Sequence, residues 1–251
     1  MPNPSGSRTL ALAGLLLLVG TSSARAGRSH YGWLYGTEVN PERGVELETW
    51  ILQENGKGDD EVGREDETLV WWGPVFSLSE KLELAVPIEF AYKREGDESG
   101  TNLERYGGEL RYRFNSPDPM LAGPVTVLVR AGAKRFAQVR SAGRGEADLV
   151  VAFERGRFHA EVDAGTVAEW VPGEDTVEFR PGAGFSIETV SRLRVGAEVY
   201  AELGVTGETK DWLAVGPTVS LTRGRYWLTG TLPIGVFGID SAPRVNFAIA
   251  F

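Results

Sequence analysis

The chain has 251 residues, of which 26 are basic and 35 are acidic, and it contains no cysteine. Its formal net charge of -9 argues against nucleic acid as a partner, because nucleic-acid binding calls for a basic face. Without disulfides, the fold must be held by packing and by hydrogen bonds.

Residues 1–26 have the features of a secretory signal peptide. Arg8 supplies a positive charge, an apolar run of 12 residues follows it, and Ala24 and Ala26 are the small residues that a signal peptidase reads. The apolar run is too short for a transmembrane helix, which needs about 20 residues. We therefore predict export and cleavage before Gly27, which leaves a charge of -11 once the two arginines of the signal peptide are lost.

Residues 27–43 come before the first regular pattern and contain Tyr31, Trp33, Leu34 and Tyr35. We assign them as an N-terminal periplasmic lead-in. Two interpretations stay open for this segment. It folds into the periplasmic mouth as a short stopper, or it is a disordered lead-in or an extra piece of the first strand.

From residue 44 onward, apolar and polar residues alternate in segments that read as strands. Short turns alternate with longer polar loops between these segments, which is the arrangement of an outer-membrane barrel. The connection at 116–123 departs from this rule, since it is long where a short turn is expected. The predicted strands are 44–54, 66–78, 82–94, 103–115, 124–137, 146–154, 158–170, 176–189, 193–206, 211–222, 226–237 and 244–251.

Alternation alone does not distinguish a soluble sandwich from a membrane barrel, so strand length and aromatic placement decide. Most predicted strands are longer than the five or six residues of soluble strands. Aromatic residues near the strand ends are expected to form an interfacial girdle. They are Tyr92, Tyr112, Phe114, Phe136, Phe158, Trp170, Trp212, Tyr226 and Trp227.

We predict an all-β fold, a transmembrane antiparallel up-and-down β-barrel of about 12 strands over residues 44–251. Prolines inside predicted strands count against it, because each lacks an N–H that a closed barrel uses. We expect bulges or rim positions at these prolines. They are Pro74, Pro87, Pro181, Pro217 and Pro233.

Two stretches carry a family resemblance. The last strand, Val245 to Phe251, ends on Phe and resembles the signature that the barrel assembly machinery recognises in bacterial outer-membrane proteins. Tyr31 to Glu38, followed by Gly44 to Trp50, is similar to a family of uncharacterised proteobacterial outer-membrane β-barrel proteins, which are porin-like. The resemblance implies a location in the outer membrane of a Gram-negative bacterium and carries no catalytic motif.

Side chains of a strand point alternately to its two faces, so the faces opposite the apolar ones direct charged side chains into the lumen. The functional interpretation is a water-filled passage with a basic wall on one side and an acidic wall on the other. The alternative is that these groups pair and fill the lumen, and 12 strands lie between filled small barrels and open large ones. The candidate lumen-lining residues are Arg105, Arg111, Arg113, Arg130, Lys134, Glu161, Asp163, Glu178, Glu198 and Glu202.

Some 12-stranded barrels are lipid hydrolases, which use a Ser and a His near the outer leaflet. The two histidines do not fit, since His30 precedes the barrel and His159 begins a strand at the short-turn side, facing inward. The chain has no nucleophile-elbow motif and no metal-ligand spacing. The acidic loop around Asp59 lacks the spacing of a calcium loop, so we expect a solvated loop there. We predict a protein that is not an enzyme, with no catalytic residue, cofactor or metal.

The first functional hypothesis is a narrow passive outer-membrane channel for ions or small polar solutes. The alternative is a closed-lumen structural or interaction barrel of the cell envelope with no transport or catalytic activity. The partners expected in either case are outer-membrane lipid and lipopolysaccharide and the barrel assembly machinery. If the protein is a channel, small polar solutes or ions are also expected partners.

Overall fold

The computed structural model describes residues 29–40, 44–58, 65–95, 98–116 and 123–251. The predicted signal peptide, most of the acidic loop and most of the connection at 116–123 lie outside these residues. Within the part that the structure covers, no helix is long and apolar enough to cross a membrane.

Every regular element among these residues is a β-strand. The strands are β1 (Val45–Lys57), β2 (Glu65–Ser79), β3 (Leu82–Ala85), β4 (Ile88–Glu95), β5 (Glu98–Arg113), β6 (Val125–Phe136), β7 (Gly143–Arg155), β8 (Phe158–Val171), β9 (Glu174–Val190), β10 (Leu193–Thr206), β11 (Trp212–Arg223), β12 (Tyr226–Thr231), β13 (Ile234–Phe237) and β14 (Arg244–Ala250).

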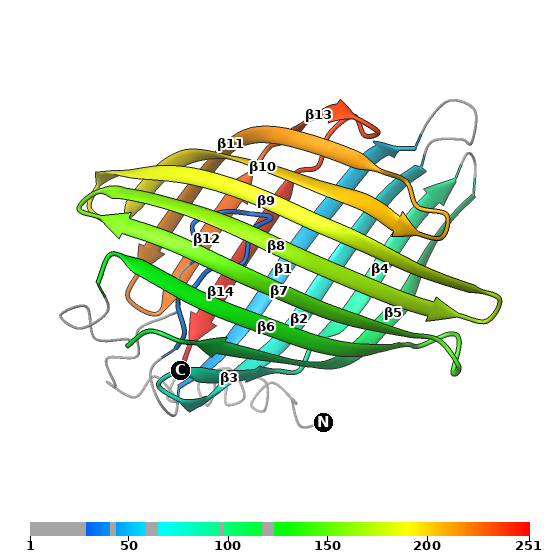
Figure 1. The fold of residues 1–251 in the computed structure, drawn as a ribbon, viewed down its shortest axis with the longest axis horizontal. Coiled ribbons are helices and arrows are strands. Elements are labelled where there is room, and N and C mark those ends of the chain that lie inside the picture. The colour runs from blue at the N-terminus through cyan, green and yellow to red at the C-terminus, as the bar shows by residue number, and fades with distance from the viewer. Residues whose placement is uncertain (1–28, 41–43, 59–64, 96–97, 117–122) are drawn as a thin grey trace, which may run out of the picture.

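The strands form one closed antiparallel barrel (Figure 1). Most strands pair with the strands before and after them in the chain, and β1 also pairs with β14, which closes the sheet. β3 and β4 both pair with β2 and β5, so they are two halves of one strand. β12 and β13 both pair with β11 and form another such strand. The 14 segments therefore make 12 strands, and the predicted barrel is confirmed.

Prolines interrupt two strands, and each interruption faces a second proline on the neighbouring strand. Pro87 separates β3 from β4, and the flanking pairs Val75 with Ala85 and Trp72 with Ile88 place Pro74 opposite the break. In the same way, Pro217 of β11 faces the break at Pro233 between β12 and β13. Hydrogen bonds still bridge each break, because the N–H of Val86 donates to the backbone oxygen of Pro74 and the N–H of Leu232 donates to that of Pro217.

The burial pattern settles which face of each strand is inside. Glu161 and Asp163 of β8 are each 2% exposed, whereas Val162 between them is 57% exposed. A soluble sandwich would bury the apolar face, so this inverted pattern indicates a barrel surrounded by lipid. Other outward-facing apolar residues are Phe90, Leu110, Leu149, Phe185, Val219, Leu228 and Phe247.

Most of the predicted aromatic girdle faces outward, but three of its members do not. Tyr112, Trp170 and Tyr226 are among the exposed aromatic residues near strand ends. Phe136 lines the barrel interior beside Arg105, and Trp212 and Trp227 are buried inside the barrel, so the prediction was wrong for these three. The indole N–H groups of the two tryptophans donate to interior glutamates, which explains why these two side chains point away from the lipid.

The two ends of the barrel differ. At one end, called the short-turn rim, strands are joined by the turns at 80–81, 156–157, 191–192 and 224–225. Gly156 and Gly224 adopt the left-handed conformation there, with φ of 64° and 61°, which suits a two-residue hairpin turn. At the other end, called the loop rim, the connections include 137–142, 207–211 and 238–243.

Candidate functional site

The candidate site is the barrel interior, where the structure places all ten of the charged residues selected from the sequence. Eight of them are buried: Arg111, Arg113, Arg130, Lys134, Glu161, Asp163, Glu198 and Glu202. Arg105 and Glu178 are partly exposed and line a cavity near the loop rim. The ten residues do not form a single cluster. Glu178 and Glu202 lie 2.6 and 3.2 Å from Arg180, and the other eight fall into three groups.

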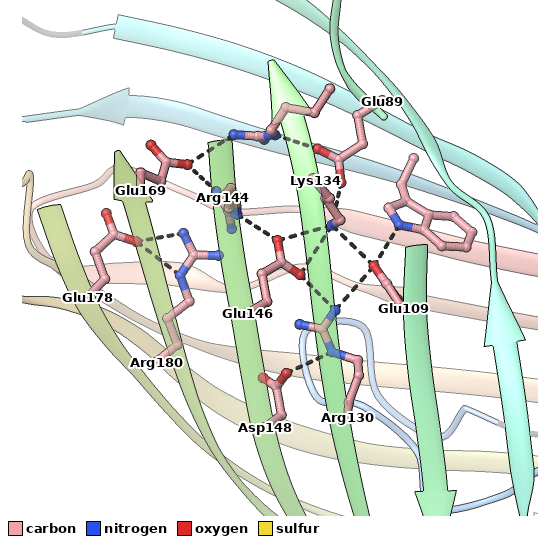
Figure 2. A network of polar contacts seen from close by, with 12 residues as sticks. Glu89, Glu109, Arg130, Lys134, Arg144, Glu146, Asp148, Glu169, Glu178 and Arg180 are labelled. Atoms are coloured by element: carbon pink, nitrogen blue, oxygen red, sulfur yellow. Dashed lines mark hydrogen bonds and ion pairs between the residues drawn. The ribbon is translucent and has the colours of Figure 1, made fainter. Parts of the chain in front are cut away.

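The first group is an ion-pair network on β4 to β8 (Figure 2). Arg130 lies 2.7 Å from both Glu146 and Asp148 and 3.1 Å from Glu109. Lys134 lies 2.6 Å from Glu89 and also contacts Glu109 and Glu146.

The network continues toward the loop rim through two more arginines. Arg105 joins Glu89 at 2.6 Å to Glu169 at 3.2 Å, and Arg144 lies 2.7 Å from the same Glu169 oxygen. The side that the sequence indicated as a basic wall is therefore neutralised by carboxylates on adjacent strands. Removing one member of such a buried network leaves its partners unpaired, which costs about 3–5 kcal/mol.

The second group lies nearer the short-turn rim. Two nitrogens of Arg111 donate to the two carboxylate oxygens of Glu48 at 2.9 and 3.1 Å, which is a bidentate pair. Arg113 lies 3.7 Å from Glu38, a residue of the segment before β1. These contacts tie β5 to β1 and to that segment.

The third group is acidic and holds residues 29–40, which we call the inner segment. The backbone N–H groups of Gly32 and Trp33 both donate to Glu198 at 3.1 Å, and the N–H of Tyr35 donates to Asp163 at 3.2 Å. The inner segment therefore lies within the barrel (Figure 1).

The inner segment enters and leaves at the same rim. Its first residue, Ser29, accepts a hydrogen bond from Thr229 of β12, and its last, Asn40, donates to Glu83 of β3. Trp33, near its middle, donates from its indole to the backbone oxygen of Ala242, which lies in the loop-rim connection 238–243. The segment is thus a loop inserted from the short-turn rim.

Glycines in the barrel wall make room for the inner segment. A Cβ atom at Gly184 of β9 would lie 2.5 Å from Cε1 of Tyr31, and one at Gly182 would clash with the Leu34 side chain. Tyr31 and Leu34 are 0% and 3% exposed. The wall and the segment therefore fit each other closely, and a larger side chain at either glycine would displace the segment.

Both histidines lie at this contact. The rings of His30 and His159 are 4.3 Å apart at their centroids, and the Tyr31 hydroxyl lies 3.1 Å from Nδ1 of His159. His159 faces inward, as its position in β8 indicated. Among the described residues, no group of three or more His, Cys, Asp and Glu side chains is arranged to hold a metal ion.

The inner segment divides the lumen into two spaces. On its loop-rim side lies a cavity of about 300 Å³, the outer cavity, which reaches the exterior beside Lys93, whose side chain is 50% exposed. On its short-turn side lies a recess of about 40 Å³ beside Ser29 and Glu46. Tyr35, Trp50 and Arg244 line both spaces, so these residues form the partition together with the segment.

Sequence reasoning missed several residues of this site. Glu109, Glu146 and Arg144 face inward with the same parity as the selected residues, so the strand pattern could have included them. Arg244 begins the last strand and could have been placed inward in the same way. The position of the inner segment has no comparable local signal, since its partners lie on strands far along the chain.

Comparison with known proteins gives the class of the fold. No protein-family model and no curated protein matches the chain. An outer-membrane channel from Pseudomonas putida F1 is similar at 9% identity with a TM-score of 0.59, over 89% of this chain and 99% of that chain.

Two further structures are similar over 83% of this chain. The translocator domain of the autotransporter NalP from Neisseria meningitidis has 12% identity and a TM-score of 0.52, with 88% of that chain covered. The KdgM porin, solved in complex with disordered oligogalacturonate, has 8% identity and a TM-score of 0.51, with 99% of that chain covered. The fold is that of the outer-membrane β-barrel proteins, a class that includes channels, porins and translocators, and at these identities the likeness concerns the fold alone.

Proposed function

We propose that this protein is a channel of the Gram-negative outer membrane for small polar solutes or ions, closed in this state by the inner segment. The observation that carries the proposal is the division of the lumen into an outer cavity and an inner recess by a loop of 12 residues. The strands form a closed sheet around this loop, so the passage is interrupted by a separate segment that packs against Trp50 and Arg244 of the wall.

The course of the inner segment allows it to leave the lumen. Both of its ends lie at the short-turn rim, near β12 and β3, so withdrawal needs no threading of chain through the barrel. Its contacts with Glu198 and Asp163 are hydrogen bonds, which water can replace on both partners. Opening therefore leaves the strand pairing intact.

The alternative, a closed barrel with a structural or interaction role, is favoured by one observation. The inner segment is bonded to many strands, and its aromatic side chains are buried against the wall. The strands that supply these hydrogen bonds are β2, β3, β6, β8, β10, β11, β12 and β14. A segment held this firmly would be a permanent part of the core.

Replacing Gly184 with Val separates the two functions. The new side chain meets Tyr31 and pushes the inner segment out of its seat, while Val is well suited to a strand. Gly230→Val is the matched control, because a Cβ at Gly230 of β12 meets no other atom within 4 Å. In planar bilayers we expect Gly184→Val to raise the open probability or step size over wild type, and Gly230→Val to match wild type. Equal conductance in both variants would favour the closed barrel.

A further inference from the structure

The partition contains an arginine whose surroundings differ from those of every other base in the outer cavity. Arg244 is 6% exposed, and its guanidinium carbon lies 5.1 Å from the Trp33 ring and 4.9 Å from the Trp50 ring. The two indoles, one from the inner segment and one from β1, therefore hold the guanidinium by cation–π contacts.

Arg244 lacks a carboxylate partner. Eight basic side chains line the outer cavity, and seven of them, such as Lys57 and Arg180, lie within 4.0 Å of a carboxylate. Arg244 forms no ion pair with any residue that the structure describes. Its Nε donates to the Asn246 side chain at 3.0 Å, and its two terminal nitrogens make no hydrogen bond within the described chain.

A second donor in the same place also lacks an acceptor. The indole Nε1 of Trp50 is buried and has no hydrogen-bond partner among the described residues. Leaving a buried donor such as this indole N–H unpaired costs about 1–3 kcal/mol. The Arg244 guanidinium lies against the same indole, and both side chains line the outer cavity, so together they offer donors to an acceptor from outside the chain.

We propose that Arg244 binds the carboxylate of a small solute that enters the outer cavity from the loop rim. A guanidinium offers two parallel N–H groups that match the two oxygens of a carboxylate, and the flanking indoles fix its plane. The cavity of about 300 Å³ is at the lower end of ligand pockets, so the solute is a small molecule.

The wall of the cavity restricts the charge of the solute. Its carboxylates, including Glu54, Asp148 and Glu202, outnumber its bases by nine to eight. A second negative charge on the solute would meet this acidic excess and be repelled. The site therefore takes a solute with one carboxylate and otherwise neutral hydrogen-bonding groups.

This inference rests on the proposed channel in that it names the solute class, but binding requires only the outer cavity. The test uses the full refolded protein in detergent, with D-glucuronate as the probe and its neutral isostere D-glucuronamide as the control ligand. Binding is measured by calorimetry and by the change in tryptophan fluorescence. We expect D-glucuronate to bind at least about tenfold more tightly than the amide, since a charge-assisted bidentate pair is lost in the amide.

Variants locate the site. Arg244→Gln should weaken D-glucuronate binding by about tenfold or more, and Arg244→Lys should give an intermediate loss, because it keeps the charge without the planar fork. Lys93→Gln is the control, since Lys93 lines the same cavity but is paired with Glu67 and half exposed, and it should bind as wild type does. Heat-modifiable migration on a gel checks that each variant is folded.

Two results would overturn the site: wild type that does not distinguish the acid from the amide, or Arg244→Gln and Arg244→Lys that both bind like wild type. These failures are separate from failure of the channel. Loss of the anion site with raised conductance in Gly184→Val leaves the channel standing. D-glucuronate binding without any conductance leaves the site standing in a closed barrel.

Discussion

Removing the Glu198 carboxylate is predicted to release the inner segment. Glu198 is 2% exposed and accepts the backbone N–H groups of Gly32 and Trp33, both at 3.1 Å. A hydrogen bond to a charged group contributes about 1.5–3 kcal/mol, and the two N–H groups regain water when the segment leaves. The two bonds end on one carboxylate, so their contributions overlap and are less than additive. Glu198→Ala should therefore shift the balance toward the withdrawn state by about 2–4 kcal/mol, which is about 30- to 1000-fold in population.

The absence of cysteine gives a direct assay for this shift. Leu34→Cys introduces a single thiol at a position that is 3% exposed in the inserted segment. The rate of maleimide labelling then reports the population in which the segment has withdrawn. We expect Glu198→Ala to raise this rate by at least the lower bound of about 30-fold.

Glu89→Ala is the matched control for the labelling experiment. Glu89 is also 2% exposed and charged, but its partners are Arg105 and Lys134, which lie outside the inner segment. Its replacement should leave the labelling rate near that of Leu34→Cys alone. Equal labelling in the Glu198 and Glu89 variants would refute the view that Glu198 holds the segment.

Two further predictions concern the wall. Arg130→Met leaves Glu109, Glu146 and Asp148 without their shared cation. It should lower the free energy of unfolding in lipid, measured by urea titration, by about 3–5 kcal/mol, and a loss below about 1 kcal/mol would contradict a cooperative network. Val162→Arg, at a lipid-facing site in the central part of β8, should cost about 2–4 kcal/mol, and Val205→Arg near the loop rim about 0–1 kcal/mol. Equal costs at the two positions would argue against lipid around the barrel.

The strands could be predicted because the alternation of polar and apolar residues is local. The segment at 193–206 has the predicted bounds, and the other strands differ from prediction by a few residues at their ends. Pro87 and Pro233 divide two strands that were predicted as continuous, because an alternating pattern does not register a missing backbone donor.

The interior was only partly predictable, because its contacts join distant parts of the chain. Strand alternation places Arg130 and Glu198 inside. The partners of Arg130 depend on the register between strands, and those of Glu198 depend on where the inner segment lies. Tyr31 packs against Gly184 and contacts His159, 128 residues away, and nothing in residues 29–40 alone indicates those neighbours. The sequence left open whether this segment folds into the barrel mouth as a stopper, and its place in the lumen and its contacts come from the structure.

The central claim is a barrel with a passage that the inner segment closes, and single-channel recording of a variant without residues 29–40 tests it most directly. The mature wild type and the deletion variant would be refolded and inserted into planar bilayers, with insertion checked by heat-modifiable migration. We predict discrete, long-lived conductance steps in the deletion variant and smaller or rarer steps in wild type. Repeated insertion of the deletion variant without any conductance would contradict the claim, since the lumen would then be closed by the wall itself.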